Sequence, residues 1–474
     1  MRLIQNPQTR LGVNLLGLKL PIMALVALLA TVAIPALAKP SDNTHEYSFD
    51  NGLKLIVKED HRAPVLVSQI WYKVGSTYEY DGISGISHAL EHMMFKGTEK
   101  FPDGAFDRIV SENGGRHNAF TSQDYTGYYQ EFEKSRLEVS FQLESDRMRG
   151  LLLPEKEFKK EIRVVMEERQ LRTEDNPQAL TYEQFNAAAF VSSSLRIPVV
   201  GWMNDLENMT IDDLSDWYEQ WYSPNNATIV VVGDVDPEEV YRLAKKYFAP
   251  IKSSKIKQPK PRQEIEQTGI RKIVVKAPAE LPYFISGYKA PSLLTAKDKS
   301  DAYALAVLSA VLDGGNSSRF AKKLIRGSEI AANISTSYRM HSRGETLFHF
   351  DGTPAEGKTI NDLIDAINAE IALLKTELVS NKELERIKAQ VVASEVYQRD
   401  SVASQASTIG ALESIGLDWR IIDEFVEKIT AVTAKDIQRV AKKYLIEDKL
   451  TIAELAPQPL DAKQPRRAST HLRH

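Results

Sequence analysis

The stretch GISHALEHMMFKGT, Gly85–Thr98, brings two histidines and a glutamate together within five residues. Its apolar residues recur three and four positions apart, which predicts an amphipathic helix. On such a helix His88 and His92 lie one turn apart on the same face. Two imidazoles at that spacing can bind one Zn²⁺, and Glu91 on the same arc stands beside the open coordination position.

The order of these residues, H-x-x-E-H, is that of the inverted zincin motif. The same pair of histidines also occurs by chance or on protein surfaces, so the motif by itself leaves both interpretations open. The rest of the sequence has to supply a third ligand and a suitable fold.

The composition of the chain excludes several functions. The 474 residues are 43% hydrophobic and 26% charged, which is ordinary for a globular protein and enough for two or three domains. The formal net charge of −4 shows no electrostatic footprint for nucleic acid. The absence of cysteine excludes disulfides and thiolate ligands, so a zinc site here must use histidine and carboxylate.

Residues 1–38 have the three-part layout of a secretory signal peptide. Basic residues precede an apolar run from Leu20 to Ile34, and the small-residue site Ala36-Leu37-Ala38 follows. An uncleaved anchor is the alternative, but about fifteen apolar residues are few for a span of roughly 20. We therefore expect an exported chain without a membrane span after cleavage, located in the periplasm rather than released from the cell.

The remaining chain is expected to form two α+β halves joined by a linker. Strands are expected over 53–57, 66–74, 227–233, 272–276 and 283–288, with an edge strand and turn in 116–129. Helices are expected over 101–110, 137–148, 155–172, 178–189, 211–222, 237–247 and 302–312. The polar, proline-containing segment 251–267 is the expected linker between domains 39–250 and 268–456, and the Pro-rich tail 457–474 is expected to be disordered.

The second half repeats the first half in outline. Two strands, a helix and a Gly-Gly ending follow in the order seen around the HxxEH segment. Aligning Gly97 with Gly314 puts Leu305 and Ser309 in place of the two histidines and Leu308 in place of the glutamate. The second half would then keep the scaffold and lack the metal site, although any two α+β domains alternate in a similar way.

A third zinc ligand is expected from the helix 155–172, because a catalytic zinc site usually takes three protein ligands and a water. On this helix Glu161 and Glu168 share a face with two valines, and an acid on an apolar face is costly to bury without a partner such as a metal. Glu167 points away and is expected in solvent. The other histidines are expected to be structural or exposed: His45, His61, His117, His341 and His349.

These residues resemble the pitrilysin/insulinase family of inverted zinc metallopeptidases, in particular its short two-domain bacterial members, which are related to the mitochondrial processing peptidase. The resemblance extends through GGRHNAFTSQDYTGYY and KEIRVVMEERQLRTEDNP to SPNNATIVVVGDVD, and covers essentially the whole chain after the signal peptide. In that family a ligand Glu follows HxxEH at a characteristic distance, which Glu168 matches. A second Glu, seven residues earlier, supports the ligands, and Glu161 stands there.

The resemblance implies two homologous sheet-plus-helices domains that close like a clamshell, with the zinc site in the N-terminal one. It implies one Zn²⁺ per chain on His88, His92 and Glu168, with Glu91 as the catalytic base. The edge strand at Asn118-Ala119-Phe120 would bind peptide substrate by strand addition, since a free strand edge offers main-chain hydrogen bonds.

One position departs from the family pattern. Full enzymes carry in the C-terminal half an Arg followed seven residues later by a Tyr, and both steady the substrate. Aligning SSRFAKKLIRGSEIAAN puts Arg326 on the Arg and Asn333 on the Tyr. Arg326 could bind substrate or be a surface residue, and the missing Tyr implies a hetero-oligomer in which a homologous subunit supplies the Arg/Tyr pair.

The sequence therefore predicts a zinc endopeptidase that hydrolyses peptides or small unfolded proteins. A non-catalytic assembly subunit of the same fold is the alternative, which the missing Tyr keeps open. A maturation protease for one secreted precursor is a third interpretation, and no residue pattern separates it from general peptide degradation.

Overall fold

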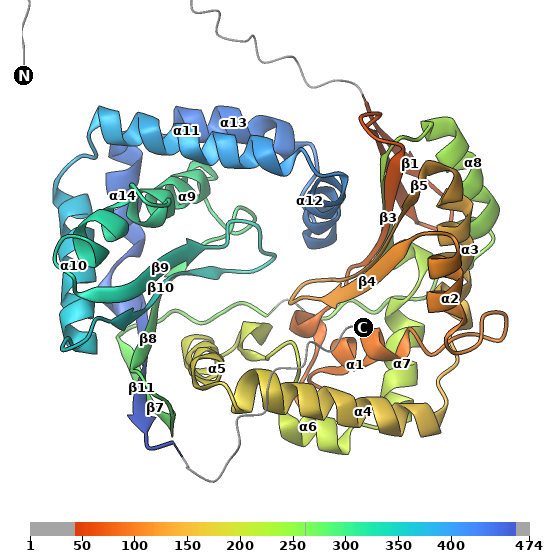
Figure 1. The fold of residues 1–474 in the computed structure, drawn as a ribbon, viewed down its shortest axis with the longest axis horizontal. Helices are drawn as coiled ribbons and strands as arrows, with labels where there is room; N and C mark the ends of the chain where they lie inside the picture. Colours follow the sequence, from red (N-terminus) through yellow and green to blue (C-terminus); the bar gives the residue numbers. More distant parts are fainter. Residues whose placement is uncertain (1–42, 261, 461–474) are drawn as a thin grey trace, which may run out of the picture. The chain divides into compact units, whose positions relative to one another are not determined.

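The structure is a computed structural model that describes residues 43–260 and 262–460 (Figure 1). Its strands are β1 Thr44–Ser48, β2 Lys54–Glu59, β3 Val65–Tyr72, β4 Arg116–Thr121, β5 Thr126–Glu133, β6 Ala227–Gly233, β7 Arg271–Pro278, β8 Tyr283–Ala290, β9 Ala331–Tyr338, β10 Thr346–Pro354 and β11 Leu450–Gln458. The predicted signal peptide and most of the predicted tail lie outside the described residues.

The helices of the first half are α1 Ile86–Met93, α2 Ala105–Glu112, α3 Leu137–Gly150, α4 Glu155–Arg169, α5 Pro177–Ala189, α6 Met203–Asn208, α7 Ile211–Trp221 and α8 Pro237–Phe248. Those of the second half are α9 Ser300–Asp313, α10 Ile360–Thr376, α11 Asn381–Gln398, α12 Val402–Ile415, α13 Ile421–Ala431 and α14 Ala434–Tyr444. The chain also forms two π-helices, η3 Gln170–Glu174 and η6 Ala321–Ile325. Within the described ranges, no helix is both long and apolar enough to cross a membrane.

The first sheet has the strand order β1-β2-β6-β3-β5-β4. β2 runs parallel to β6 and the other neighbours are antiparallel. Strand β6 reads as an unbroken apolar run because both of its faces are buried: Ile229 and Val231 enter the main core, and Val230 and Val232 enter a cluster on the opposite face. β4 lies at the free edge of this sheet, as the sequence predicted.

The second sheet has the order β7-β11-β8-β10-β9 and repeats the first sheet from β2 onwards. Its β7–β11 pair is parallel, like β2–β6, and β8 and β10 run antiparallel to their neighbours, like β3 and β5. Helix α9 follows β8 as α1 follows β3 (Figure 1). The predicted α+β class with two homologous sheet-plus-helices halves is therefore confirmed. The exact domain boundaries stay a prediction, although 251–260 and 262–267 form neither helix nor strand.

Each sheet is covered on one face by a helix from the other half of the chain. Helix α12 packs on β3 and β6, where Ala406 and Ile409 join the cluster around Trp71. Helix α5 packs on β7, β8 and β11, where Phe185 and Ala189 join a cluster of the second sheet.

Gly410 of α12 is the point of closest approach between that helix and the first sheet, because a Cβ there would overlap the Trp71 ring. We predict that Gly410→Ala lowers the free energy of unfolding by about 1–2 kcal/mol, since overpacking costs more than the gain in helix propensity. Urea unfolding measures the change. The matched control is Gly150→Ala at the end of α3, where a Cβ would make only an ordinary 3.8 Å contact. Equal stability of the two variants would contradict the tight packing of α12.

Candidate metal centre

Helix α1 presents its histidines on the face opposite its apolar side chains. Ile86, Leu90 and Met93 are fully buried in the first core. The His88 side chain is 12% exposed and that of His92 is 4% exposed, so both lie at the floor of a cavity. The helical periodicity read from the sequence therefore produces the predicted shared face.

The N-terminus of α1 is held by a buried carboxylate. Glu79 is 1% exposed and accepts hydrogen bonds from the backbone N–H groups of Gly85, at 2.7 Å, and Ser87, at 2.9 Å. Negative charge at this end of a helix satisfies free N–H groups and is favoured by the helix dipole. Gly85 has φ +86°, and a Cβ there would overlap the carbonyl oxygen of Val200, so only glycine fits.

Helix α4 brings the predicted carboxylates to α1, against which it packs. The Glu168 side chain is 4% exposed and that of Glu161 is 16% exposed, whereas Glu167 is exposed as expected. The end of α4 is fixed by Arg169, which donates two hydrogen bonds to Glu183 of α5 and one to the carbonyl oxygen of Gly201. These buried contacts set the place of Glu168.

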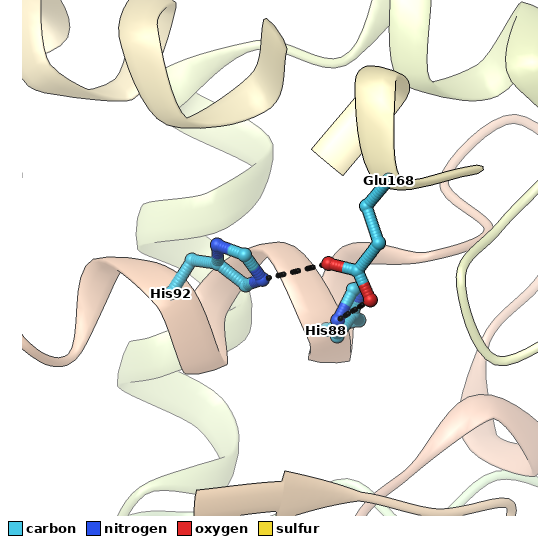
Figure 2. Close-up of side chains that lie close together, drawn as sticks. All are labelled: His88, His92 and Glu168. Carbon is cyan, nitrogen blue, oxygen red and sulfur yellow. Dashed lines mark ion pairs between the residues drawn. The ribbon is translucent and has the colours of Figure 1, made fainter. Parts of the chain in front are cut away.

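The structure brings His88, His92 and Glu168 into one group, with one donor atom from each lying within 4.8 Å of the others (Figure 2). Glu168 Oε1 lies 3.8 Å from His88 Nε2, and Glu168 Oε2 lies 3.5 Å from His92 Nε2. Oε2 is buried without a hydrogen-bond partner in the described part of the chain, which is costly for a carboxylate. Two imidazoles and a carboxylate around such an oxygen fit the three-ligand set of a catalytic zinc site.

Glu161 orients His92 from the side away from this group. Its Oε2 lies 3.4 Å from His92 Nδ1, and its Oε1 forms an ion pair with Lys96 Nζ at 2.7 Å. Donation from Nδ1 leaves Nε2 directed at Glu168. Burial lowers the pKa of His92, but the hydrogen bond with Glu161 and the ion pair with Glu168 outweigh it and raise that pKa to about 9. The hydrogen bond with His92 lowers the pKa of Glu161 to about 2.

Glu91 is held by the edge strand β4. Thr121 Oγ1, at the end of β4, donates to Glu91 Oε2 at 2.5 Å. Burial raises the pKa of Glu91, although this hydrogen bond and the neighbouring His92 act to lower it. A carboxylate whose pKa is raised in this way is suited to taking up and returning a proton.

A cavity of about 990 Å³ opens above the three candidate ligands. Asn118-Ala119-Phe120 of β4 line it together with Glu91, so the structure brings the predicted substrate strand and the predicted base to one cavity. An apolar wall comes from Leu195, Ile197, Pro198, Val199 and Val200. α5 contributes Tyr182, which is 42% exposed.

Arg326 is not among the described residues that line this cavity. It is exposed at the end of η6, and its guanidinium donates to the carbonyl oxygen of Asn316. Asn333 is exposed on β9. The other histidines lie away from the three ligands: His45 and His61 pair with Glu59, His117 with Asp107, and His349 with Ser337, while His341 is in a loop.

Sequence reasoning missed four residues that shape the site. They are Glu79, Thr121, Arg169 and Arg172. Arg172 stands one turn after Glu168, a spacing visible in the sequence as an i, i+4 acid–base pair. Thr121 and Arg169 contact residues 14 to 32 positions away in the chain. Glu79 contacts Gly85 and Ser87, six and eight positions along, and no periodic pattern indicates any of these contacts.

The fold and the ligand set together are those of an inverted zincin. Residues 54–201 match the family model described as insulinase (peptidase family M16), and residues 208–391 match the model described as the peptidase M16 inactive domain. The chain is 32% identical over 415 residues to the zinc protease PqqE of Helicobacter pylori, covering 86% of this chain and 91% of that protein. The chain therefore belongs to peptidase family M16, the insulinase family, as the resemblance predicted.

Other relatives and solved structures agree with this assignment. The probable mitochondrial-processing peptidase subunit beta of Arabidopsis thaliana is 24% identical over 428 residues, covering 87% of this chain and 78% of that protein. A crystal structure of a protease from Helicobacter pylori is 31% identical with a TM-score of 0.83, covering 87% of this chain and 99% of that chain. The first half of the periplasmic protease PqqL of Escherichia coli, 18% identical with a TM-score of 0.74 over 89% of this chain and 94% of that chain, shares the fold.

Glu161→Gln should weaken zinc binding by about 10- to 100-fold, because the imidazole of His92 loses the carboxylate that orients it. Titration against a chelator of known affinity measures the change. The control is Glu167→Gln, a substitution of the exposed glutamate one residue before Glu168. Equal affinities of the two variants would show that Glu161 does not support the site.

The zinc affinity should rise with pH between about 7 and 9. His92, with a pKa of about 9, carries a proton at pH 7 that a metal ligand must lose. Release of one proton makes the affinity increase by about tenfold per pH unit in that range. Chelator competition at several pH values, corrected for the chelator's own protonation, gives the slope. A flat profile would mean that His92 is neutral before the metal binds, or that it is not a ligand.

Proposed function

We propose that this protein is a zinc-dependent endopeptidase that hydrolyses peptides or small unfolded proteins in the periplasm, with one Zn²⁺ per chain on His88, His92 and Glu168. The observation that carries the proposal is that this ligand group, the half-buried Glu91 and the free edge of β4 meet at one cavity. The names of relatives as zinc proteases support it. Export is supported by the signal-peptide layout of residues 1–38, and a structural neighbour is described as periplasmic.

Substrate binding in this proposal uses the edge strand. The main chain of a peptide adds to β4 along Asn118-Ala119-Phe120, where it meets no other strand of the sheet. Thr121 continues the same strand and holds the base, so a peptide in register with β4 has its backbone beside Glu91. The apolar wall at 195–200 then contacts side chains of the bound peptide.

Glu91 moves the proton. When bound, zinc supplies Lewis-acid chemistry that polarises a carbonyl and makes water more acidic. Glu91 takes a proton from the attacking water as its oxygen bonds to the scissile carbon. The C–N bond then breaks, and Glu91 returns the proton to the leaving amine. Thr121 keeps one oxygen of Glu91 fixed during both transfers.

A second candidate function is a non-catalytic assembly subunit. Asn333 in place of the family Tyr, and Arg326 bound to Asn316 away from the cavity, favour it. The peptidase proposal explains the missing Tyr differently: a homologous partner subunit carries the Arg/Tyr pair. Peptide cleavage measured with and without a co-purifying chain, alongside zinc content, separates these two functions.

Glu91→Gln should keep zinc and lose peptidase activity, because the amide cannot accept the proton of water. General acid–base groups contribute about 10²- to 10⁴-fold, so kcat should fall at least about 10²-fold. Zinc content by elemental analysis and cleavage of quenched fluorescent peptides are the two measurements. Glu167→Gln is the control with full activity. Undiminished cleavage by Glu91→Gln would remove Glu91 from the mechanism, and wild-type cleavage that survives zinc removal would overturn the metallopeptidase proposal.

A further inference from the structure

Arg172 reaches into the candidate metal centre from the solvent side of the cavity. It lies on η3, the π-helix that continues α4, one turn after Glu168. Its side chain is 65% exposed, yet its Nη1 forms an ion pair with Glu168 Oε1, whose side chain is 4% exposed. A π-helix widens the helical turn, and such bulges are frequent at functional sites. The exposed Arg172 side chain, which lines the cavity, is therefore paired with a buried carboxylate.

The ion pair leaves the ligand group intact. Arg172 contacts Oε1 of Glu168, whereas Oε2 is the buried oxygen without a hydrogen bond that faces His92. A carboxylate can give one oxygen to a metal and the other to a guanidinium at the same time. Arg172 thus holds Glu168 without occupying the oxygen directed at His92.

Among the cationic side chains that line the cavity, Arg172 is the one that contacts a candidate metal ligand. Of the described residues lining the cavity, two arginines carry a permanent positive charge, Arg172 and Arg196. Arg196 Nη2 donates to both carboxylate oxygens of Asp81, at 2.7 and 3.0 Å. Arg172 has Glu168 as its one ion-pair partner in the described part of the chain, and its positive charge acts on Glu91 as well as on Glu168.

A guanidinium has five N–H donors in a planar fork, and one carboxylate oxygen does not use them all. The reaction proposed above develops negative charge on the scissile carbonyl oxygen when water adds to the carbon. A hydrogen-bond donor that stabilises this charge must lie at the cavity surface, must stay charged and must be held in place before the substrate arrives. Arg172 meets these three requirements, because it is exposed, cannot deprotonate and is fixed by Glu168.

We propose that Arg172 is a catalytic residue that donates hydrogen bonds to the scissile carbonyl oxygen, while its ion pair with Glu168 keeps it in position. This inference rests on the proposed peptidase function. As the water oxygen bonds to the carbon, the π electrons move to the carbonyl oxygen and Glu91 takes the water proton. Arg172 stabilises the resulting oxyanion without changing its own protonation. When the C–N bond breaks, the C=O bond re-forms and Arg172 releases the product carbonyl.

The test compares Arg172→Met with Arg163→Met, the same substitution at an exposed position of α4. All variants are first checked for folding by thermal melting and are assayed with saturating zinc. We expect Arg172→Met to lower kcat by about 10²- to 10³-fold, the usual loss for one oxyanion donor, with KM changed less than threefold. Arg172→Lys should retain part of the activity, since it keeps the charge and loses the fork.

Two inhibitors distinguish oxyanion binding from support of Glu168. A phosphinic pseudopeptide, whose tetrahedral anionic centre resembles the intermediate, should lose affinity for Arg172→Met in proportion to kcat. A reduced-amide peptide of the same sequence lacks the oxygen and should bind within threefold of wild type. Zinc affinity, measured by chelator competition, should fall no more than about tenfold.

The inference is overturned if zinc-saturated Arg172→Met has a kcat within threefold of wild type. It is equally overturned if kcat falls while the affinity for the phosphinic pseudopeptide is unchanged, or if zinc affinity falls in proportion to activity. These results leave the peptidase function standing as long as the wild-type protein cleaves peptide in a zinc-dependent manner. Absence of that wild-type activity would instead defeat the proposed function.

Discussion

The burial of the Glu168 carboxylate is the interaction on which the site depends. A carboxylate taken out of water is destabilising unless charged or hydrogen-bonding partners surround it. Here His88, His92 and Arg172 all face it, and they offset the cost of its burial, so that the pKa of Glu168 is lowered to about 2. One oxygen still lacks a hydrogen bond, and a metal ion supplies the compensation that the protein alone does not.

Holding that carboxylate in place requires three separate parts of the chain. Glu79 fixes the start of α1, Arg169 fixes the end of α4, and the segment around Gly201 touches both, since a Cβ at Gly201 would overlap Ser84 and Gly85. Rigid support of this kind lets ligands and base reach a working geometry before substrate binds. The second half of the chain repeats the sheet. At the positions aligned with the HxxEH residues, α9 has the buried Leu305 and Leu308, which belong to its core.

Much of the fold could be predicted from the sequence because the decisive signals are local. Helices α1 and α4 show a 3.6-residue periodicity because each buries one face. Strand β6 is an unbroken apolar run because it buries both faces. Helix α12 is buried against the first sheet through small residues such as Gly410, so it shows little amphipathic contrast. The metal ligands followed from spacing, whereas Thr121 and Arg169 act through contacts with residues 14 to 32 positions away in the chain.

The central claim is that one zinc ion binds where α1 and α4 meet. Its most direct test is anomalous X-ray scattering at the zinc absorption edge from crystals of the zinc-loaded protein. The account predicts one strong peak per chain, about 2.0–2.2 Å from a ring nitrogen of His88, a ring nitrogen of His92 and a carboxylate oxygen of Glu168. A zinc-loaded crystal with its peak elsewhere, or with no peak beside these three residues, would contradict it.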